Sequence, residues 1–507
     1  MNRFASAALS LALCALSPAE AGPAPETVKH ALVKAVAFYH AKASSHGGYV
    51  YRCSGDFSLR EAEGIPGPDT IWIQPPGTPA VGGAFLDVYE WTRDPACLAA
   101  AVDAAHALTR TQMASGGWDY SGHFDGAHRD QQFYRRDPDG KLLDRTAAPS
   151  GEAGWHIWRQ RNHHETNSTT LDDDVTQSAL RLLIRVDQAL GFADQEIHES
   201  VEYGMKAILT AQYPCGAWSA SFETHPASSP SAERYPLRRA SNPEAWSRTW
   251  TKDFTGCYVT NDNLHATMIR TLLLAAQVYR DSKYTEAAKR AGEFLILAQL
   301  PEPQPGWAQQ YDPQMQPVWS RAFEPPAVSG RESQAMMWAL LTLCAATGDK
   351  KFLAPLTPAL AYFRRSLLPD GRLARFYELE TNKPIYFKRG PGGKGHELTY
   401  EDDNTASNYG WKWESELDAI EATGKRLAVG GVAPGLYTLP PVKRLSDGEA
   451  DRILGALDAN GAWVEREGDR GIMRDAGGRK TQPVAGVIHG DAFVTNITAL
   501  CLWARGR

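Results

Sequence analysis

The sequence predicts an all-α dominated fold, an α/α toroid in which repeated helical hairpins, long loops and short β-hairpins surround a cleft. Three observations support this prediction. Helical hydrophobic periodicity recurs along the chain, a glycine-aromatic element follows each helical run, and capping residues precede the next run. Repeated hairpins of unequal length, with long loops at one end, favour a toroid over an open solenoid.

A glycine-aromatic element marks the end of each helical unit. Several follow a helix end that contains glutamine, as at Ala211-Gln212 and Ala298-Gln299. The fifth element has leucine in the aromatic place. In chain order the elements are Gly47-Gly48-Tyr49, Gly116-Gly117-Trp118, Gly216-Ala217-Trp218, Gly306-Trp307-Ala308, Gly371-Arg372-Leu373 and Gly461-Ala462-Trp463.

Capping residues mark the helix starts, because their side chains accept hydrogen bonds from the first free N–H groups of a helix. Asp172-Asp173-Asp174 precedes the run 175–183, and Asn261-Asp262-Asn263 precedes the run 264–279. Further starts lie at 78–81, 329–332 and 490–491. Around six such units could close a ring. The insertions 119–170 and 219–260 would wall its mouth, since loops of this length are usually functional.

Composition and the N-terminus bear on location and partners. The chain has 507 residues, 43% of them hydrophobic, and a net charge of −6, which argues against nucleic-acid or membrane-surface binding. Residues 1–21 have the pattern of a signal peptide: Arg3, an apolar core over 4–16, and Ala19-Glu20-Ala21 as the cleavage site. We therefore expect a single α/α toroid domain over 22–507, secreted or periplasmic in a Gram-negative-like bacterium, and monomeric.

Cysteine usage does not indicate a disulfide scaffold. Of seven cysteines, Cys14 lies in the signal segment, which leaves six in a long chain. Cys344 and Cys501 lie in apolar helical runs and are expected in the core. Cys215 and Cys257 lie in loop-like segments, so a disulfide between them is one alternative for an exported protein. The absence of a C-x-x-C spacing argues against structural zinc.

The densest acidic cluster is Asp172-Asp173-Asp174. Carboxylates at a junction of loop and helix suit Ca²⁺, which prefers hard oxygen ligands. The alternative is a helix cap stabilised by the helix dipole. Asp262 heads the equivalent helix of the next unit and would face the same cleft, which favours a metal or substrate site. His163-His164 has no evident third partner, so a surface loop is the simpler interpretation.

Two segments combine cations with aromatic residues. The stretch 375–389 follows a Pro369-Asp370-Gly371 turn, so we expect a loop or short hairpin outside the helical body. Arginine binds planar carboxylates through two parallel hydrogen bonds, and lysine adds a point charge, so this stretch suits an acidic sugar. In the other segment, 306–326, Arg321 lies between aromatic residues and is either a cleft residue or the partner of Glu324.

Together these motifs resemble the family 10 pectate lyases (pectic acid lyases). The resemblance rests on the runs WAQQYDP at 307–313, RAFEPP at 321–326 and RFYELETNKP at 375–384. The segment 170–176 is similar to the acidic Thr-x-Asp-x-x-x-Thr motif of that family. Two departures bear on the substrate: Asp173-Asp174 replaces less acidic residues, and the long insertion 119–170 carries Arg129, Arg135, Arg136, Arg159 and Arg161.

The resemblance implies an α/α toroid that cleaves polygalacturonate by β-elimination with Ca²⁺. It implies Arg321 as the catalytic base, with Arg331 as the alternative. Aromatic residues of the repeat could stack on sugars or serve as buried anchors. For substrate binding we expect Arg375, Arg389, Lys383, Asp172, Asp262, Trp307 and Tyr377, and for Ca²⁺ we expect Asp172, Asp173 and Asp262.

β-Elimination removes the C5 proton of a uronate and expels the C4 oxygen, a step helped by cations that stabilise the developing charge. The sequence therefore predicts a secreted polysaccharide lyase acting on pectate or a related uronate polymer. One alternative is an inverting glycoside hydrolase on the same fold, with Asp172 and either Asp262 or Glu324 about 6.5–9.5 Å apart. Another is a non-catalytic uronate-binding protein.

Overall fold

The computed structural model describes residues 22–143, 167–250, 258–407, 409–430, 444–465, 472–475, 477–481 and 484–506. Helices dominate this part of the chain. They are α1 (Pro25–Ala43), α2 (Thr78–Thr92), α3 (Pro95–Thr109), α4 (Gly126–Arg129), α5 (Val175–Ala189), α6 (Gln195–Ala211), α7 (Leu264–Tyr279), α8 (Ser282–Ala298), α9 (Gly330–Thr347), α10 (Leu356–Arg365), α11 (Leu417–Ala428), α12 (Asp447–Gly455) and α13 (Gly490–Arg505). Short 3₁₀ turns are η1 (Asp172–Asp174), η2 (Asn261–Asn263), η3 (Lys350–Leu353) and η4 (Pro391–Gly393).

The strands are short and lie between the helices. They are β1 (Arg52–Ser54), β2 (Arg60–Glu61), β3 (Thr70–Trp72), β4 (Ser121–His123), β5 (Thr169–Thr170), β6 (Ser221–Phe222), β7 (Tyr258–Val259), β8 (Gln310–Tyr311), β9 (Ala327–Ser329), β10 (Leu373–Ala374), β11 (Phe376–Glu378), β12 (Pro384–Arg389), β13 (His396–Thr399), β14 (Lys412–Trp413), β15 (Val464–Glu465) and β16 (Val487–His489). All their pairings are antiparallel.

The helices form an α/α toroid, as the sequence predicts. Successive helices pack as the hairpins α2–α3, α5–α6 and α7–α8. One helix of each unit contacts the next unit, in the order α13, α2, α5, α7, α9 and α11. The inner helix α9 is buried almost all round, which suits a helix enclosed by its neighbours. The all-α dominated architecture is therefore confirmed.

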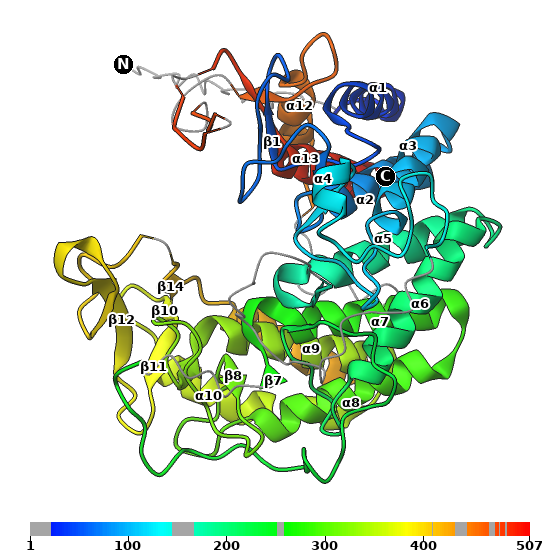
Figure 1. Ribbon diagram of the computed structural model, residues 1–507. Helices are drawn as coiled ribbons and strands as arrows, with labels where there is room; N and C mark the ends of the chain where they lie inside the picture. The colour runs from blue at the N-terminus through cyan, green and yellow to red at the C-terminus, as the bar shows by residue number, and fades with distance from the viewer. Residues whose placement is uncertain are drawn as a thin grey trace, which may run out of the picture.

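Figure 1 shows the units as an arc. One end is the block of α1, α12 and α13, and the other carries the yellow strand β12; the ribbons of the two ends stay apart in this view. The first and last segments of the chain meet in the same block, because α13 packs on α2 and β1 pairs with β16. The described helices therefore form an incomplete toroid, an open arc in place of the closed ring that six units could form.

The tryptophans of the repeat are buried anchors. The indole N–H of Trp118 donates to the Leu108 carbonyl at 2.8 Å, and that of Trp218 donates to the Ile208 carbonyl at 2.9 Å. The Trp307 indole does the same to the Leu295 carbonyl at 2.7 Å. All three side chains are fully buried. Each element thus fastens the loop after a helix to the end of that helix.

The stretch 375–389 forms the expected hairpin. Strands β11 and β12 pair with Phe376 opposite Ile385, and β9 and β13 extend them to a four-stranded sheet. Cys344 and Cys501 are buried, as predicted. Cys215 is a buried free cysteine, and its suggested partner Cys257 lies outside the described residues. Among the described helices, none is both long and apolar enough to cross a membrane.

Candidate functional site

Two equivalent loops lie at the starts of the inner helices α5 and α7. In η1 the backbone of Asp173 and Asp174 is left-handed (φ 49° and 62°), and in η2 Asp262 and Asn263 repeat this conformation (φ 44° and 62°). Asp and Asn adopt it more readily than other residues that carry a side chain. The two loops contact each other. The match places Asp262 in the position of Asp173, and Asn261 in that of Asp172.

Three carboxylates converge where these loops meet. Asp172, Asp173 and Asp262 each offer an oxygen, and these oxygens lie within 4.8 Å of one another. Asp172 is only 6% exposed, and its Oδ1 has no hydrogen-bond partner in the described structure. Helix capping does not explain the cluster, since Asp174 makes no capping bond to α5 and pairs with Arg181 instead.

Burial and like charge make the cluster a strong acceptor for a cation or a proton. Burial, together with the charges of Asp262 and Asp173, raises the pKa of Asp172 well above its usual range. Burial, Asp262 and Glu63 raise the pKa of Asp173 to about 6. Gln74 donates to Asp173 at 3.1 Å, and the Tyr120 hydroxyl lies 3.5 Å from the same oxygen.

Two arginines approach this cluster from other segments. Arg331, at the start of α9, donates to Asp262 at 2.8 Å and lies 3.3 Å from Glu332. Arg375 donates to the same Glu332 oxygen at 2.9 Å and lies 3.9 Å from Asp262. Glu332 is fully buried; the charges of Arg375 and Arg331 outweigh the effect of burial and lower its pKa. Glu332 therefore fixes both guanidinium groups beside the carboxylates.

Arg321 is held by a second buried glutamate. Its Nη2 pairs with Glu324, which is 1% exposed, while the Arg321 side chain is 28% exposed. The Glu324 hydrogen bond and charge outweigh burial and raise the pKa of Arg321. Glu332 and Asp262 likewise raise the pKa of Arg331. Both guanidinium groups are therefore firmly cationic in this arrangement.

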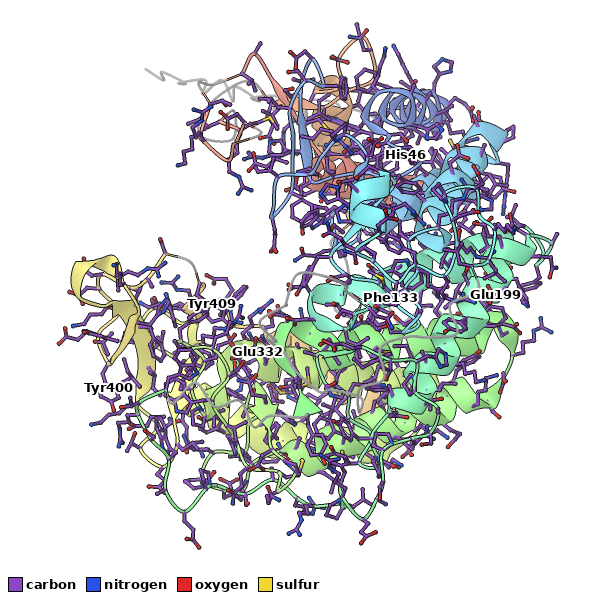
Figure 2. All side chains as sticks on the ribbon, viewed as in Figure 1. His46, Phe133, Glu199, Glu332, Tyr400 and Tyr409 are labelled. Carbon is purple, nitrogen blue, oxygen red and sulfur yellow. The ribbon has the colours of Figure 1, made fainter. Side chains whose placement is uncertain are left out.

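Two aromatic residues that the sequence analysis did not single out complete the site. The Arg375 guanidinium lies 3.7 Å from the ring centre of Tyr409, and that of Arg331 lies 4.6 Å from the ring centre of Trp413. The Tyr409 hydroxyl donates to Glu324 at 2.8 Å. The aromatic spacing of Tyr409-Gly410-Trp411 and Trp413 is the signal that could have found them. Figure 2 shows Tyr409 and Glu332 on the inner side of the arc.

The structure does not give every predicted substrate residue access to a ligand. Trp307 is fully buried as an anchor, and Tyr377 is 1% exposed, with its hydroxyl bound to the Ser366 carbonyl at 2.7 Å. Neither ring has a face left for a sugar. Arg375 is 2% exposed, so it holds Glu332 and Asp262 in place of contacting solvent. These three residues act in packing and positioning in this arrangement.

Of the four other predicted substrate residues, Asp172 and Asp262 belong to the acidic cluster, and Arg389 and Lys383 lie away from it. Arg389 is exposed on β12, with Nη1 3.5 Å from His396. Lys383 is exposed before β12, and its Nζ lies 5.5 Å from the ring centre of Tyr400, which Figure 2 shows at the outer edge of the arc. Their place on the hairpin is compatible with a more distant part of a polymer.

The arginines of the long insertion are structural where the structure describes them. Arg135 and Arg136 are buried and pair with Glu199 of α6, the second at 2.6 Å. Arg129 is also buried and donates to the His123 carbonyl at 2.9 Å. Arg159, Arg161 and His163-His164 lie outside the described residues. The first three arginines therefore hold the insertion against α6 and its own backbone.

Comparisons with known proteins return similarities of fold. No family model matches the chain, and no curated protein matches it. A family 10 polysaccharide lyase from Cellvibrio cellulosa is similar over 69% of this chain and 97% of its own, at 18% identity and a TM-score of 0.41.

Two further solved structures have other activities. A cellobiose 2-epimerase from Spirochaeta thermophila covers 81% of this chain and 99% of its own, at 13% identity and a TM-score of 0.41. An inactive variant of an alpha-1,6-mannanase of Salegentibacter is similar over 95% of this chain and 99% of its own, at 11% identity and a TM-score of 0.38. Similarities this low assign no reaction or substrate.

Proposed function

We propose that the protein is a carbohydrate-active enzyme, a secreted polysaccharide lyase that cleaves polygalacturonate or a related uronate polymer by β-elimination. One observation carries the proposal: Asp172, Asp173 and Asp262 converge within reach of a single cation, beside arginines from later segments. A bound uronate needs such cations to neutralise its carboxylate. The motifs at 307–313, 321–326 and 375–384 support the same substrate class.

The three carboxylates fit a Ca²⁺ ion. Asp172 Oδ1 is a buried acceptor without a donor, and the mutual repulsion of the group is relieved by a divalent cation. Asp172, Asp173 and Asp262 would hold the ion, which takes hard oxygen ligands of this kind. When bound, Ca²⁺ would neutralise a uronate carboxylate and so acidify the neighbouring C5–H bond.

The partly exposed arginines are the groups that would meet the substrate. Arg331 is 22% exposed and Arg321 is 28% exposed, whereas Arg375 is buried behind them. We assign Arg331 to binding the uronate carboxylate, because Asp262 and Glu332 fix its charge and position. Arg375, stacked on Tyr409, keeps Glu332 in place. This pre-organisation costs no rearrangement as charge develops.

Arg321 is the proposed base, with Arg331 as the alternative. The base takes the C5 proton, the C–H electrons form the C4–C5 double bond, and the C4–O bond breaks, its oxygen taking a proton from water. A guanidinium can accept a proton only in its neutral form, and Glu324 opposes that form by raising the pKa of Arg321. Catalysis through Arg321 therefore requires its pairing with Glu324 to weaken as substrate binds.

The assay follows the ultraviolet absorbance of the new double bond on polygalacturonate with Ca²⁺. We expect a rise that stops with EDTA and falls by at least about 100-fold in Arg321→Ala, the scale of a lost acid-base group. Arg331→Ala should raise KM more than it lowers kcat. Arg452→Ala, on the exposed side of α12, is the matched control and should keep both kcat and KM.

Other outcomes separate the competing functions. New reducing ends without ultraviolet absorbance would indicate a hydrolase, and retention of the polymer without either product would indicate a binding protein. The spacing disfavours the inverting hydrolase with Asp172 and Asp262, because oxygens within 4.8 Å leave less room for a water than the usual separation of about 6.5–9.5 Å. If kcat survives in Arg321→Ala but not in Arg331→Ala, Arg331 is the base.

A further inference from the structure

A second group of metal-ligating side chains lies at the end of the two-stranded β3–β4 sheet and on the short helix α4. His123 ends β4, Asp125 caps α4, and His128 lies on α4. Each offers one ligand atom, and these three atoms lie within 4.8 Å of one another. The backbone helps to set this arrangement, because the His128 N–H donates to Asp125 at 3.0 Å. The group therefore needs little rearrangement to surround an ion.

The two imidazoles are oriented by their neighbours. Their ring centres lie 5.1 Å apart with planes at 19°, and Nδ1 of His128 lies 2.7 Å from Asp125. One His123 nitrogen lies 3.2 Å from the Thr70 hydroxyl, and the other lies 3.2 Å from the Ser121 hydroxyl. Whichever nitrogen binds an ion, the other retains an acceptor for its N–H, the usual support of a metal-bound histidine.

We propose that His123, Asp125 and His128 bind a divalent transition-metal ion of the zinc type. Two imidazoles and one carboxylate suit Zn²⁺ and its neighbours in the first transition row, whereas Ca²⁺ prefers oxygen ligands. Three protein ligands leave coordination positions for water, which fits the 60% exposure of the His128 side chain. The positive charge of Arg129 disfavours a cation at this site, and the negative charge of Asp125 offsets that effect.

The site has a structural consequence for the acidic cluster. Strands β3 and β4 pair Thr70 with His123 at one end and Trp72 with Ser121 at the other. Beyond the second end, Gln74 and Tyr120 both reach Asp173. An ion at His123 would therefore fix the two-stranded sheet whose other end contacts Asp173. The proposed ion binding does not depend on the proposed lyase reaction, because it is measured without any substrate.

Co²⁺ is the probe, because its visible absorption reports the number and type of its ligands. Untagged protein, stripped with EDTA, is titrated with Co²⁺ and then with Zn²⁺. With excess Ca²⁺ present to occupy the acidic cluster, we expect one Co²⁺ per chain with the strong absorption of a four-coordinate site, displaced by Zn²⁺. His128→Gln and His123→Gln should each weaken Co²⁺ binding by at least about ten-fold. His30→Gln, on the exposed face of α1, and Asp173→Asn, in the acidic cluster, should leave the spectrum unchanged.

Each result decides the proposal. Wild-type binding in both His123→Gln and His128→Gln would overturn it, as would the absence of a four-coordinate spectrum in the wild type. Loss of the spectrum in Asp173→Asn would move the ion to the acidic cluster. His123 is half-buried, so its variant is checked by circular dichroism; His128 is exposed, and its variant decides the outcome if the other does not fold.

Discussion

Asp172 shows what a single residue contributes to the account. A buried carboxylate with an unpartnered oxygen, next to two further carboxylates, is costly to keep in a folded protein. Left-handed backbone at Asp173 and Asp262 adds to that cost. Groups that destabilise the folded protein in this way are typical of functional sites, where activity requires them.

The first prediction follows from this repulsion. Without added Ca²⁺, Asp172→Asn should stabilise the protein by about 0.5–2 kcal/mol, because one of three like charges is removed. The same variant should lose activity. Urea unfolding in EDTA measures the stability, and Asp458→Asn, a loop carboxylate outside the cluster, is the control. A loss of stability in Asp172→Asn would mean that the carboxylate is structurally satisfied.

Tyr409 carries the second prediction. Tyr409→Phe removes the hydroxyl that donates to buried Glu324, and should cost about 1–3 kcal/mol in unfolding free energy. Tyr409→Leu also removes the ring under Arg375 and should lower activity further. Chemical denaturation and kcat are measured on both variants. Equal activity in the two would show that the stacked ring does not position Arg375.

The sequence predicted part of this site for identifiable reasons. Asp172 and Asp262 could be found because the segments 172–174 and 261–263 precede equivalent helices of the repeat. The aromatic spacing at 409–413 could have drawn attention to Tyr409, but not its role, because its contacts with Arg375 and Glu324 join segments that no local pattern relates. The burial of Trp307 and Tyr377 could not be predicted either, since glycine and aromatic residues in a sequence do not distinguish a buried anchor from a ring that stacks on a sugar.

At the scale of elements, the repeat predicted helix starts well. The runs 175–183 and 264–279 begin where α5 (Val175–Ala189) and α7 (Leu264–Tyr279) begin. The capping segment 329–332 is expected to precede the next helix, but α9 already begins at Gly330, because the Ser329 side chain accepts from the Glu332 N–H and so caps it. Local hydrogen bonds determine the first residue of a helix, and hydrophobic periodicity in the sequence does not report them.

The anchor of each unit gives the third prediction. Trp218→Phe removes the indole N–H that bonds the Ile208 carbonyl and should destabilise the protein by about 1–3 kcal/mol. Trp91→Phe, on the partly exposed side of α2, should change stability by less than about 0.5 kcal/mol. Urea unfolding compares the two. Equal effects would refute the anchoring role of the repeat.

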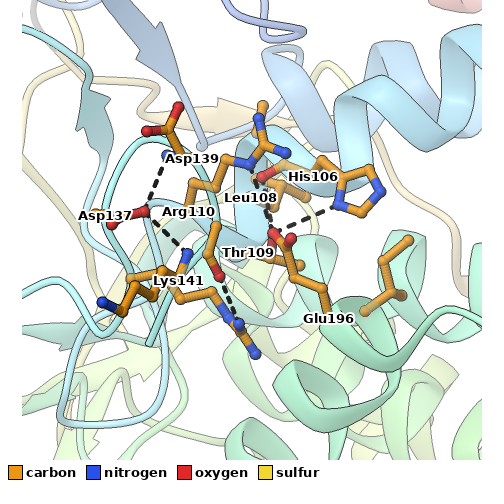
Figure 3. Close-up of polar contacts among 12 residues, drawn as sticks. His106, Leu108, Thr109, Arg110, Asp137, Asp139, Lys141 and Glu196 are labelled. Atoms are coloured by element: carbon orange, nitrogen blue, oxygen red, sulfur yellow. Dashed lines mark hydrogen bonds and ion pairs between the residues drawn. The ribbon is translucent and has the colours of Figure 1, made fainter. Parts of the chain in front are cut away.

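A polar network between α3 and α6 gives a prediction on pH (Figure 3). His106 lies 3.0 Å from Asp194 and 3.4 Å from Glu196, and Glu196 also accepts from Thr109. The Glu196 hydrogen bond and charge raise the pKa of His106 above 6.5. Burial raises the pKa of Glu196, but bonds from His106 and Thr109 outweigh it, so that this pKa falls below 4.5.

The direction of each change in stability with pH follows from the difference between the pKa of the group in the folded and in the unfolded protein. The contribution of His106 to the free energy of unfolding is complete below about pH 6.5. It is lost as the pH rises through the higher pKa that His106 has in the folded state. The Glu196 contribution is present above about pH 4.5 and is lost as the pH falls. The fourth prediction is therefore that the stability of the wild type over His106→Gln shrinks from pH 6 to pH 9. An advantage that grows with pH would contradict it.

At the scale of the whole molecule, the arc explains why distant segments share one site. The inner helices α5, α7 and α9 are neighbours, so the loops at their starts bring Asp172, Asp262 and Arg331 together. The hairpin of β11 and β12 adds Arg375 from the next unit. The toroid could be predicted from the repeat, whereas the pairing of each arginine with its own buried glutamate depends on packing across units.

The proposed β-elimination is tested most directly by cleaving polygalacturonate in ¹⁸O-labelled water and measuring the products by mass spectrometry. Elimination breaks the C4–O bond without adding water, so we predict unsaturated oligouronates that carry no solvent ¹⁸O at the cleaved bond. They should be absent in EDTA and in Arg321→Ala. Saturated products that carry one ¹⁸O would show hydrolysis instead, and would contradict the assignment of Arg321 and the acidic cluster to β-elimination.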